Sequence, residues 1–211
     1  MHTIAVTQAV QSINQAESLF GLSRAAEEHF FSEWTENLLE LTAAETASLD
    51  RVKNSYLYNS ADGPLSESTV NLLLVSPLLY LAGFCDPPFK IRGEMAVEIT
   101  AQENDNTLSG RIDALVLKEQ IWLILVESKQ TKFSFSVAIP QALAYMMGSP
   151  NLERPTFGMV TNGDGFLFLK LLRQPLPTYA LSDDFSLFNQ SRNELYDVLR
   201  IMKRLGEVTV S

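Results

Sequence analysis

Two short apolar segments separated by a polar triplet constrain the fold of this chain more than any other feature. Residues 111–117 and 121–129 are each rich in β-branched residues and leucine. Both segments have the length of buried strands and are too short for typical helices. The polar break at residues 118–120 suits a turn, so the sequence predicts a β-hairpin.

The register of this hairpin brings acidic side chains together. A three-residue loop centred on Gln120 predicts three opposed pairs: Leu117 with Leu123, Leu115 with Leu125, and Asp113 with Glu127. Opposed residues on antiparallel strands have Cβ atoms about 4.5–5.5 Å apart, and two carboxylates that close repel each other unless a cation or a proton lies between them. Lys129, two residues beyond Glu127, lies on the same face of the strand.

These side chains have the composition of a magnesium site with a lysine beside it. Hard divalent cations take carboxylate and carbonyl oxygens as ligands. A bound Mg²⁺ or Mn²⁺ would polarise a phosphoryl oxygen and lower the pKa of a bound water, and Lys129 would position that water or offset charge in the transition state. The pattern therefore predicts phosphodiester hydrolysis, with a half-buried salt-bridged cluster at a sheet edge as the structural alternative.

The order of these residues resembles the core of the PD-(D/E)xK nuclease superfamily. Asp113 is followed by an acid-x-Lys motif at residues 127–129 and by a Gln-x-x-x-Tyr motif at Gln141 and Tyr145. More narrowly, this combination resembles the N-terminal nuclease domain of type I restriction subunits. The resemblance covers about residues 65–172 and implies an α/β, restriction-endonuclease-like fold with a mixed central sheet flanked by helices.

The resemblance also implies roles for individual residues. Asp113 and Glu127 would bind Mg²⁺ or Mn²⁺, with the Ser128 carbonyl as a third ligand, and Lys129 would be the catalytic lysine. Glu67, at the start of a preceding helix, is a further candidate ligand, although the helix dipole alone also favours a glutamate there.

Four more residues complete the implied site. Gln141 would belong to the catalytic set. Tyr145 lies four residues later on the same helical face, and would support the metal ligands or contact the DNA backbone. Arg111 and Lys132 are candidate phosphate contacts near the site.

Two departures from the family limit what the resemblance implies. Ile112 stands where the family motif has proline, and the sequence contains no Gly-x-x-x-x-Gly-Lys-Ser/Thr phosphate loop. We therefore expect a nuclease-like domain without an ATP-dependent translocase. The expected substrate is DNA. The protein would act as a monomer, as a homodimer, or together with separate restriction–modification or translocase subunits.

The remaining sequence predicts one compact domain with a helical N-terminal extension. The turn-rich segment 59–64 is the expected boundary between the extension, residues 1–60, and the nuclease-like core, residues 61–211. The other expected elements are a helix over 24–40, a capped helix from Thr42 to about Tyr58, a helix over 67–84 loosened at Pro77, a strand over 89–99, a helix capped by Ser136 and ended at Gly148, a hairpin around 163–165, and a helix from Ser191 to Gly206.

Charge argues against strong binding to DNA. The net charge is −9, and residues 1–70, with ten acids and three bases, supply −7 of it, which leaves −2 for residues 71–211. The alternative function is therefore a catalytically silent nuclease-fold module that binds nucleic acid or protein. No apolar segment reaches the roughly 20 residues of a membrane span, and without a signal-peptide pattern we expect a cytoplasmic protein.

Overall fold

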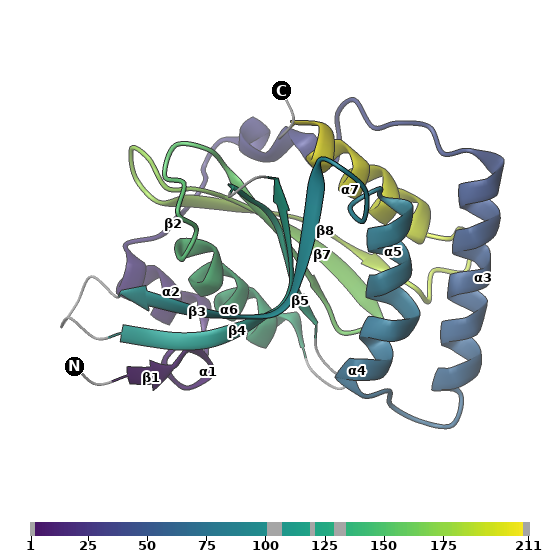
Figure 1. Ribbon diagram of the computed structural model, residues 1–211, viewed down its shortest axis with the longest axis horizontal. Helices are drawn as coiled ribbons and strands as arrows, with labels where there is room; N and C mark the ends of the chain where they lie inside the picture. The colour runs from purple at the N-terminus through teal and green to yellow at the C-terminus, as the bar shows by residue number, and fades with distance from the viewer. Residues whose placement is uncertain (1–2, 101–106, 119–120, 129–133, 209–211) are drawn as a thin grey trace.

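One mixed β-sheet with helices on both faces forms the centre of the protein (Figure 1). The computed structural model describes residues 3–100, 107–118, 121–128 and 134–208. The expected mixed α/β class is confirmed. Within these ranges, no helix combines the length and the apolar character needed to cross a membrane.

The described residues form eight strands that pair in a single sheet. Along its main path the order is β1-β4-β5-β6-β7-β8-β2, and β3 pairs with β4 off this path. The β1–β4, β5–β6 and β2–β8 pairs are parallel, and the others are antiparallel. The strands are β1 Thr3–Ala5, β2 Ser23–Arg24, β3 Phe89–Thr100, β4 Thr107–Lys118, β5 Ile121–Ser128, β6 Thr156–Thr161, β7 Gly165–Leu172 and β8 Thr178–Ser186.

Two separate hydrophobic clusters hold the helices on the two faces of the sheet. In one, α1, α2 and α6 pack against the sheet; in the other, α3, α4, α5 and α7 pack with the short helical segments η1 and η2 (Figure 1). The helical elements are α1 Val6–Ala9, α2 Ile13–Phe20, η1 Glu28–Trp34, α3 Ala43–Ser60, α4 Glu67–Val70, η2 Asn71–Val75, α5 Ser76–Leu81, α6 Phe135–Met147 and α7 Leu195–Val208.

From α4 to β6 the chain follows the order helix, three antiparallel strands, helix, strand. α4, η2 and α5 form one continuous helical run, in which the wide π turn of η2 directly precedes Ser76 and Pro77. Proline removes a helical hydrogen bond and clashes with the preceding turn, which accounts for the expected loosening at this point. β3, β4 and β5 then form an antiparallel meander, and α6 crosses over so that β6 runs parallel to β5.

The first sixty residues contribute strands as well as helices. β1 pairs in parallel with Thr107–Ser109 of β4, and β2 pairs in parallel with Thr178 and Tyr179 of β8. This segment is therefore not wholly helical, because two short pieces of it extend the sheet.

The helix expected over residues 24–40 is wrong, because only the short 3₁₀ helix η1 forms there. Its backbone departs from helical values at Phe31, with φ −123° and ψ 63°. The Phe31 ring stacks on Phe157 with centroids 5.9 Å apart, and Lys170 Nζ donates to the Phe30 carbonyl at 2.7 Å. Packing on the sheet thus replaces the helical bonds that the apolar spacing predicted.

The other expected helices and strands form, with shifts of up to four residues at their ends. α3 begins at the predicted capping box, in which Thr42 and Glu45 bond reciprocally. Ser134 caps α6 in place of Ser136, because the Ser136 amide donates to Ser134 Oγ at 3.2 Å. α7 begins at Leu195 and continues through Gly206.

Candidate functional site

The two acidic strand residues of the predicted site occupy adjoining positions on β4 and β5. Leu115 pairs with Leu125, as predicted, and the β4–β5 ladder ends one residue before Asp113 and Glu127. The same register, extended by one residue, would set these two residues opposite each other, so their predicted pairing stays a prediction.

The turn end of the same hairpin differs from the prediction. Leu117 pairs with Trp122 and not with Leu123, because a β-bulge lies between Val116 and Leu117. A bulge adds one residue to one of two paired strands. It therefore compensates for a turn one residue shorter than predicted and keeps the predicted register at the acidic end.

Several predicted site residues lie partly or wholly outside the described part of the structure. Glu127 and Ser128 are in β5, beside the last two residues of β6, but their side chains lie outside the described residues. Lys129 and Lys132 lie outside them altogether.

Asp113 lies where two clefts meet. The first, which we call the Asn71 cleft, has a volume of about 330 Å³ and lies between the α4–α5 run and strands β3 and β4. The second, the Tyr145 cleft, has a volume of about 440 Å³ and is bordered by β1, α1, β3, β4 and α6. Half-buried Asp113 lines both clefts.

Tyr145 reaches its cleft across a glycine of β4. A Cβ atom at Gly110 would lie 2.4 Å from Tyr145 Cε1 and 2.7 Å from the Tyr145 hydroxyl oxygen. Only glycine lets an aromatic ring approach the strand backbone this closely. The fold thus brings Tyr145 of α6 to the cleft that Arg111 and Asp113 also line.

Gln141 lies one helical turn before Tyr145 and is buried in the same helix. The residue is 4% exposed, and its Oε1 atom accepts no hydrogen bond from any residue that the structure describes. Burying an acceptor without a donor costs about 1–3 kcal/mol. A group of this kind in a native core therefore calls for a specific role.

Arg111 is exposed at the edge of the Tyr145 cleft and is paired with a glutamate. Its Nη1 atom donates to Glu94 Oε2 at 3.3 Å, and the two side chains are 65% and 78% exposed. Glu94 has a φ of 49°, which is uncommon for a long side chain. Its neighbours in β3 pair with the residues on either side of Asp113, so Glu94 stands opposite Asp113 in an interrupted ladder.

Glu67 lies in the first turn of α4, which the Ser66 side chain caps. It is half-buried and does not line the Asn71 cleft, whereas Asn71, one turn later on the same helical side, lines it together with Asp113. The residues predicted for the site did not include Asn71. The available signal was a polar residue four positions after Glu67 at the head of an apolar run.

The turn after β6 is fixed at the end of the sheet where Glu127 lies. Gly163 has a φ of +88°, and a Cβ atom on it would lie 2.6 Å from the Tyr56 hydroxyl and 3.0 Å from Val70 Cγ2. The buried Tyr56 of α3 donates to Asp164 Oδ1 at 2.8 Å. Burial, followed by this bond to a carboxylate, raises the pKa of Tyr56. Helices α3 and α4 therefore buttress the carboxyl ends of β5 and β6.

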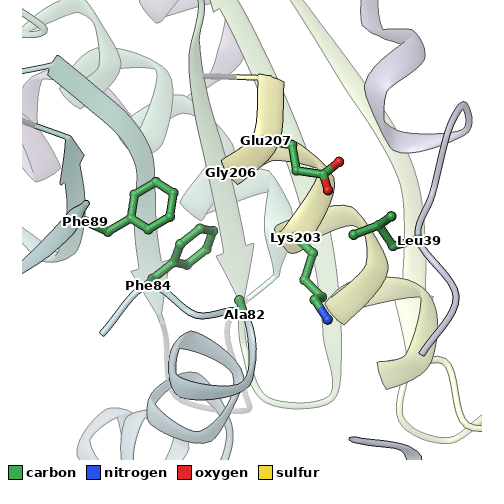
Figure 2. A pocket seen from close by; sticks show the side chains of 7 residues that line it. All are labelled: Leu39, Ala82, Phe84, Phe89, Lys203, Gly206 and Glu207. Carbon is green, nitrogen blue, oxygen red and sulfur yellow. The ribbon is translucent and has the colours of Figure 1, made fainter. Parts of the chain in front are cut away.

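A third cleft, of about 410 Å³, lies away from the predicted site residues and is lined mainly by apolar side chains. Figure 2 shows Phe84 and Phe89 on one side of this cleft, and Lys203 and Glu207 of α7 with Leu39 on the other. The two rings meet edge to face with centroids 5.2 Å apart, and Lys203 is bonded to Glu45. The charged residues that line this cleft are Lys203 and Glu207.

Among the described residues, no group of three or more His, Cys, Asp or Glu side chains is arranged to hold a metal ion. The Glu127 side chain and Lys129 lie outside the described residues to which this statement applies. Neither a protein-family model nor a curated protein matches this sequence.

Proposed function

We propose that this protein is a Mg²⁺-dependent endonuclease with a restriction-endonuclease-like core that hydrolyses DNA phosphodiester bonds. One observation carries the proposal: the β4–β5 register leads to Asp113 and Glu127 at adjoining positions, and Tyr145 of the next helix lines the same cleft as Asp113. The order helix, three antiparallel strands, helix, strand from α4 to β6 supports the likeness to the PD-(D/E)xK core.

The proposed reaction assigns the acidic residues to the cation. Asp113, Glu127 and the Ser128 carbonyl supply the kind of oxygen ligand that Mg²⁺ or Mn²⁺ prefers. Glu67, in the first turn of α4, is a further candidate ligand. When bound, the cation supplies Lewis-acid activation of the phosphate and of a water molecule. Lys129 offsets the negative charge that develops on the phosphate.

The remaining assigned residues bind and orient DNA. Arg111 and Lys132 form charge-assisted hydrogen bonds to phosphate oxygens. Gln141 and Tyr145 position the reacting groups from α6, and the buried Gln141 Oε1 supplies an acceptor that is not used by any described residue.

The net charge of −9 favours a second candidate, a binding module without catalysis, since an acidic protein repels DNA. Magnesium titration separates the two functions, because a ligand that binds only the folded state raises its stability by about 2.7 kcal/mol at a hundred times Kd. For a chain of this size that corresponds to roughly 5–11 °C in Tm. An enzyme with the assigned site shows such a shift at millimolar Mg²⁺ or Mn²⁺, and a silent module shows none.

Cleavage of supercoiled plasmid with Mg²⁺ or Mn²⁺ tests the enzyme directly. Wild type is compared with Lys129→Ala and Asp113→Asn, and with Asp183→Asn, which removes an exposed carboxylate from β8, a strand remote from β4 in the sheet. We expect wild type and Asp183→Asn to cleave and the two site variants to lose cleavage. Equal cleavage by all four proteins would assign the activity to a contaminant or to another site.

A further inference from the structure

The exposed ion pair beside Asp113 points to a regulatory role that the proposed site does not include. We propose that Glu94 holds Arg111 away from the DNA backbone until a phosphate displaces it, so that Glu94 limits the affinity of the Tyr145 cleft for DNA. This inference rests on DNA as the ligand of the proposed function, but not on catalysis.

The geometry of the pair supports an exchangeable contact. Arg111 Nη1 and Glu94 Oε2 are 3.3 Å apart, and both side chains are largely exposed. Exposed ion pairs contribute little to stability, so the contact opens easily. A phosphate offers a guanidinium the same kind of charged oxygen acceptor as a carboxylate, with room for two parallel hydrogen bonds. The Glu94 carboxylate therefore occupies the Arg111 guanidinium to which a phosphate would otherwise bind.

The backbone at Glu94 supports a specific role for its carboxylate. The φ of 49° at this position would suit glycine, which the chain already has at the preceding Gly93. A long side chain is instead held in a left-handed conformation within a strand, at a local cost that such positions carry mainly at functional sites. This conformation interrupts the β3–β4 ladder opposite Asp113, so the carboxylate is placed close to the proposed reaction.

Charge in the cleft gives Glu94 an effect on affinity. Arg111 is the only Lys or Arg among the described residues that line the Tyr145 cleft. While Arg111 is paired with Glu94, the described lining of this cleft offers no other lysine or arginine to a polyanion. Release of Arg111 supplies a contact for a phosphate near Asp113.

The test is equilibrium binding of a short fluorescent DNA duplex in EDTA, measured by anisotropy over a range of salt concentrations. Glu94→Gln should bind about two- to fivefold more tightly than wild type, which is the range expected from releasing an exposed ion pair. The slope of log K against log salt should steepen by about one, because one more phosphate is neutralised. Glu94→Gly, which fits the backbone, should behave in the same way.

Two controls separate this mechanism from a general change in charge. Glu98→Gln removes an exposed carboxylate from the same strand, and Arg111→Gln removes the proposed phosphate contact. The gain from Glu94→Gln should exceed that from Glu98→Gln and should disappear in the Arg111→Gln background. Equal gains at Glu94 and Glu98, a gain that persists without Arg111, or no measurable binding by Glu94→Gln would overturn the inference.

The outcomes distinguish this inference from the proposed nuclease activity. If the binding gain occurs but wild type leaves plasmid intact with both metals, the role of Glu94 stands and the nuclease proposal fails. If wild type cleaves plasmid while Glu94→Gln binds like Glu98→Gln, the nuclease proposal stands and the role of Glu94 fails.

Discussion

Replacement of Gly163 by alanine probes how α3 and α4 hold the turn after β6. With a φ of +88° at this position, an alanine costs about 1–3 kcal/mol. Its Cβ atom would also lie 2.6 Å from the Tyr56 hydroxyl, so that hydroxyl must move and lose its 2.8 Å bond to Asp164. A hydrogen bond to a charged group contributes about 1.5–3 kcal/mol. We therefore expect Gly163→Ala to lower the free energy of unfolding by about 2.5–6 kcal/mol.

Urea unfolding followed by circular dichroism measures this loss, with Gly63→Ala as the matched control. Gly63 also has a positive φ, of +138°, but a Cβ atom there meets nothing within 4 Å. Gly63→Ala should therefore lower the free energy of unfolding only by the cost of the positive φ, about 1–3 kcal/mol. Tyr56→Phe alone should cost about 1.5–3 kcal/mol, through the same hydrogen bond to Asp164.

The double variant Gly163→Ala with Tyr56→Phe decides whether the two effects share one cause. Because the hydrogen bond can be lost only once, the double variant should be more stable than the sum of the single losses predicts, by about 1.5–3 kcal/mol. Strictly additive losses, or a Gly163→Ala loss no larger than that of Gly63→Ala, would refute the proposed contact between the turn and α3.

Two other substitutions test the packing of the site and the attachment of α3. Gly110→Ala should destabilise the protein by about 1–3 kcal/mol and reduce plasmid cleavage, since its Cβ atom would lie 2.4 Å from the Tyr145 ring. The control is Gly93→Ala on β3, whose Cβ atom would meet no atom closer than 3.8 Å. Thermal unfolding should show little change in the stability of this control. The hydrogen bond from Lys203, followed by that from the helix cap, lowers the pKa of Glu45 to about 2. The carboxylate thus stabilises the fold above its unfolded pKa of about 4.5, and this contribution is lost as the pH falls toward 2. Glu45→Gln should therefore cost about 1–3 kcal/mol at pH 7, and urea titrations should show that difference shrinking between pH 4.5 and 2; a constant difference would contradict the assignment.

Local sequence signals accounted for the elements whose bonds and packing lie close together along the chain. The capping box of Thr42 and Glu45 predicted the start of α3, because its hydrogen bonds join residues three positions apart. The alternation of apolar residues predicted β3. Both signals are read over one or two turns or strand repeats, so distant contacts alter them little.

Elements that depend on distant partners were predicted poorly. β1 and β2 contain three and two residues, too few for any periodic pattern, and they exist because β4 and β8 offer free edges to pair with. The segment around Phe31 has helical spacing but is drawn onto the sheet by Phe157. The free energy of these contacts exceeds the small local preference for a helix.

For the candidate site, the sequence by itself determined the order of the chemical groups. The hairpin register predicted from the sequence pairs Asp113 with Glu127, and the Gln-x-x-x-Tyr spacing places Gln141 and Tyr145 on one helical face. Only the tertiary structure decided what surrounds Asp113. The bulge that restores the register, the cleft shared with Asn71 and the ion pair between Arg111 and Glu94 arise where segments distant in sequence meet. Spacing along the chain fixes which side chains share a strand or helix face, whereas packing between elements fixes which of these faces come together.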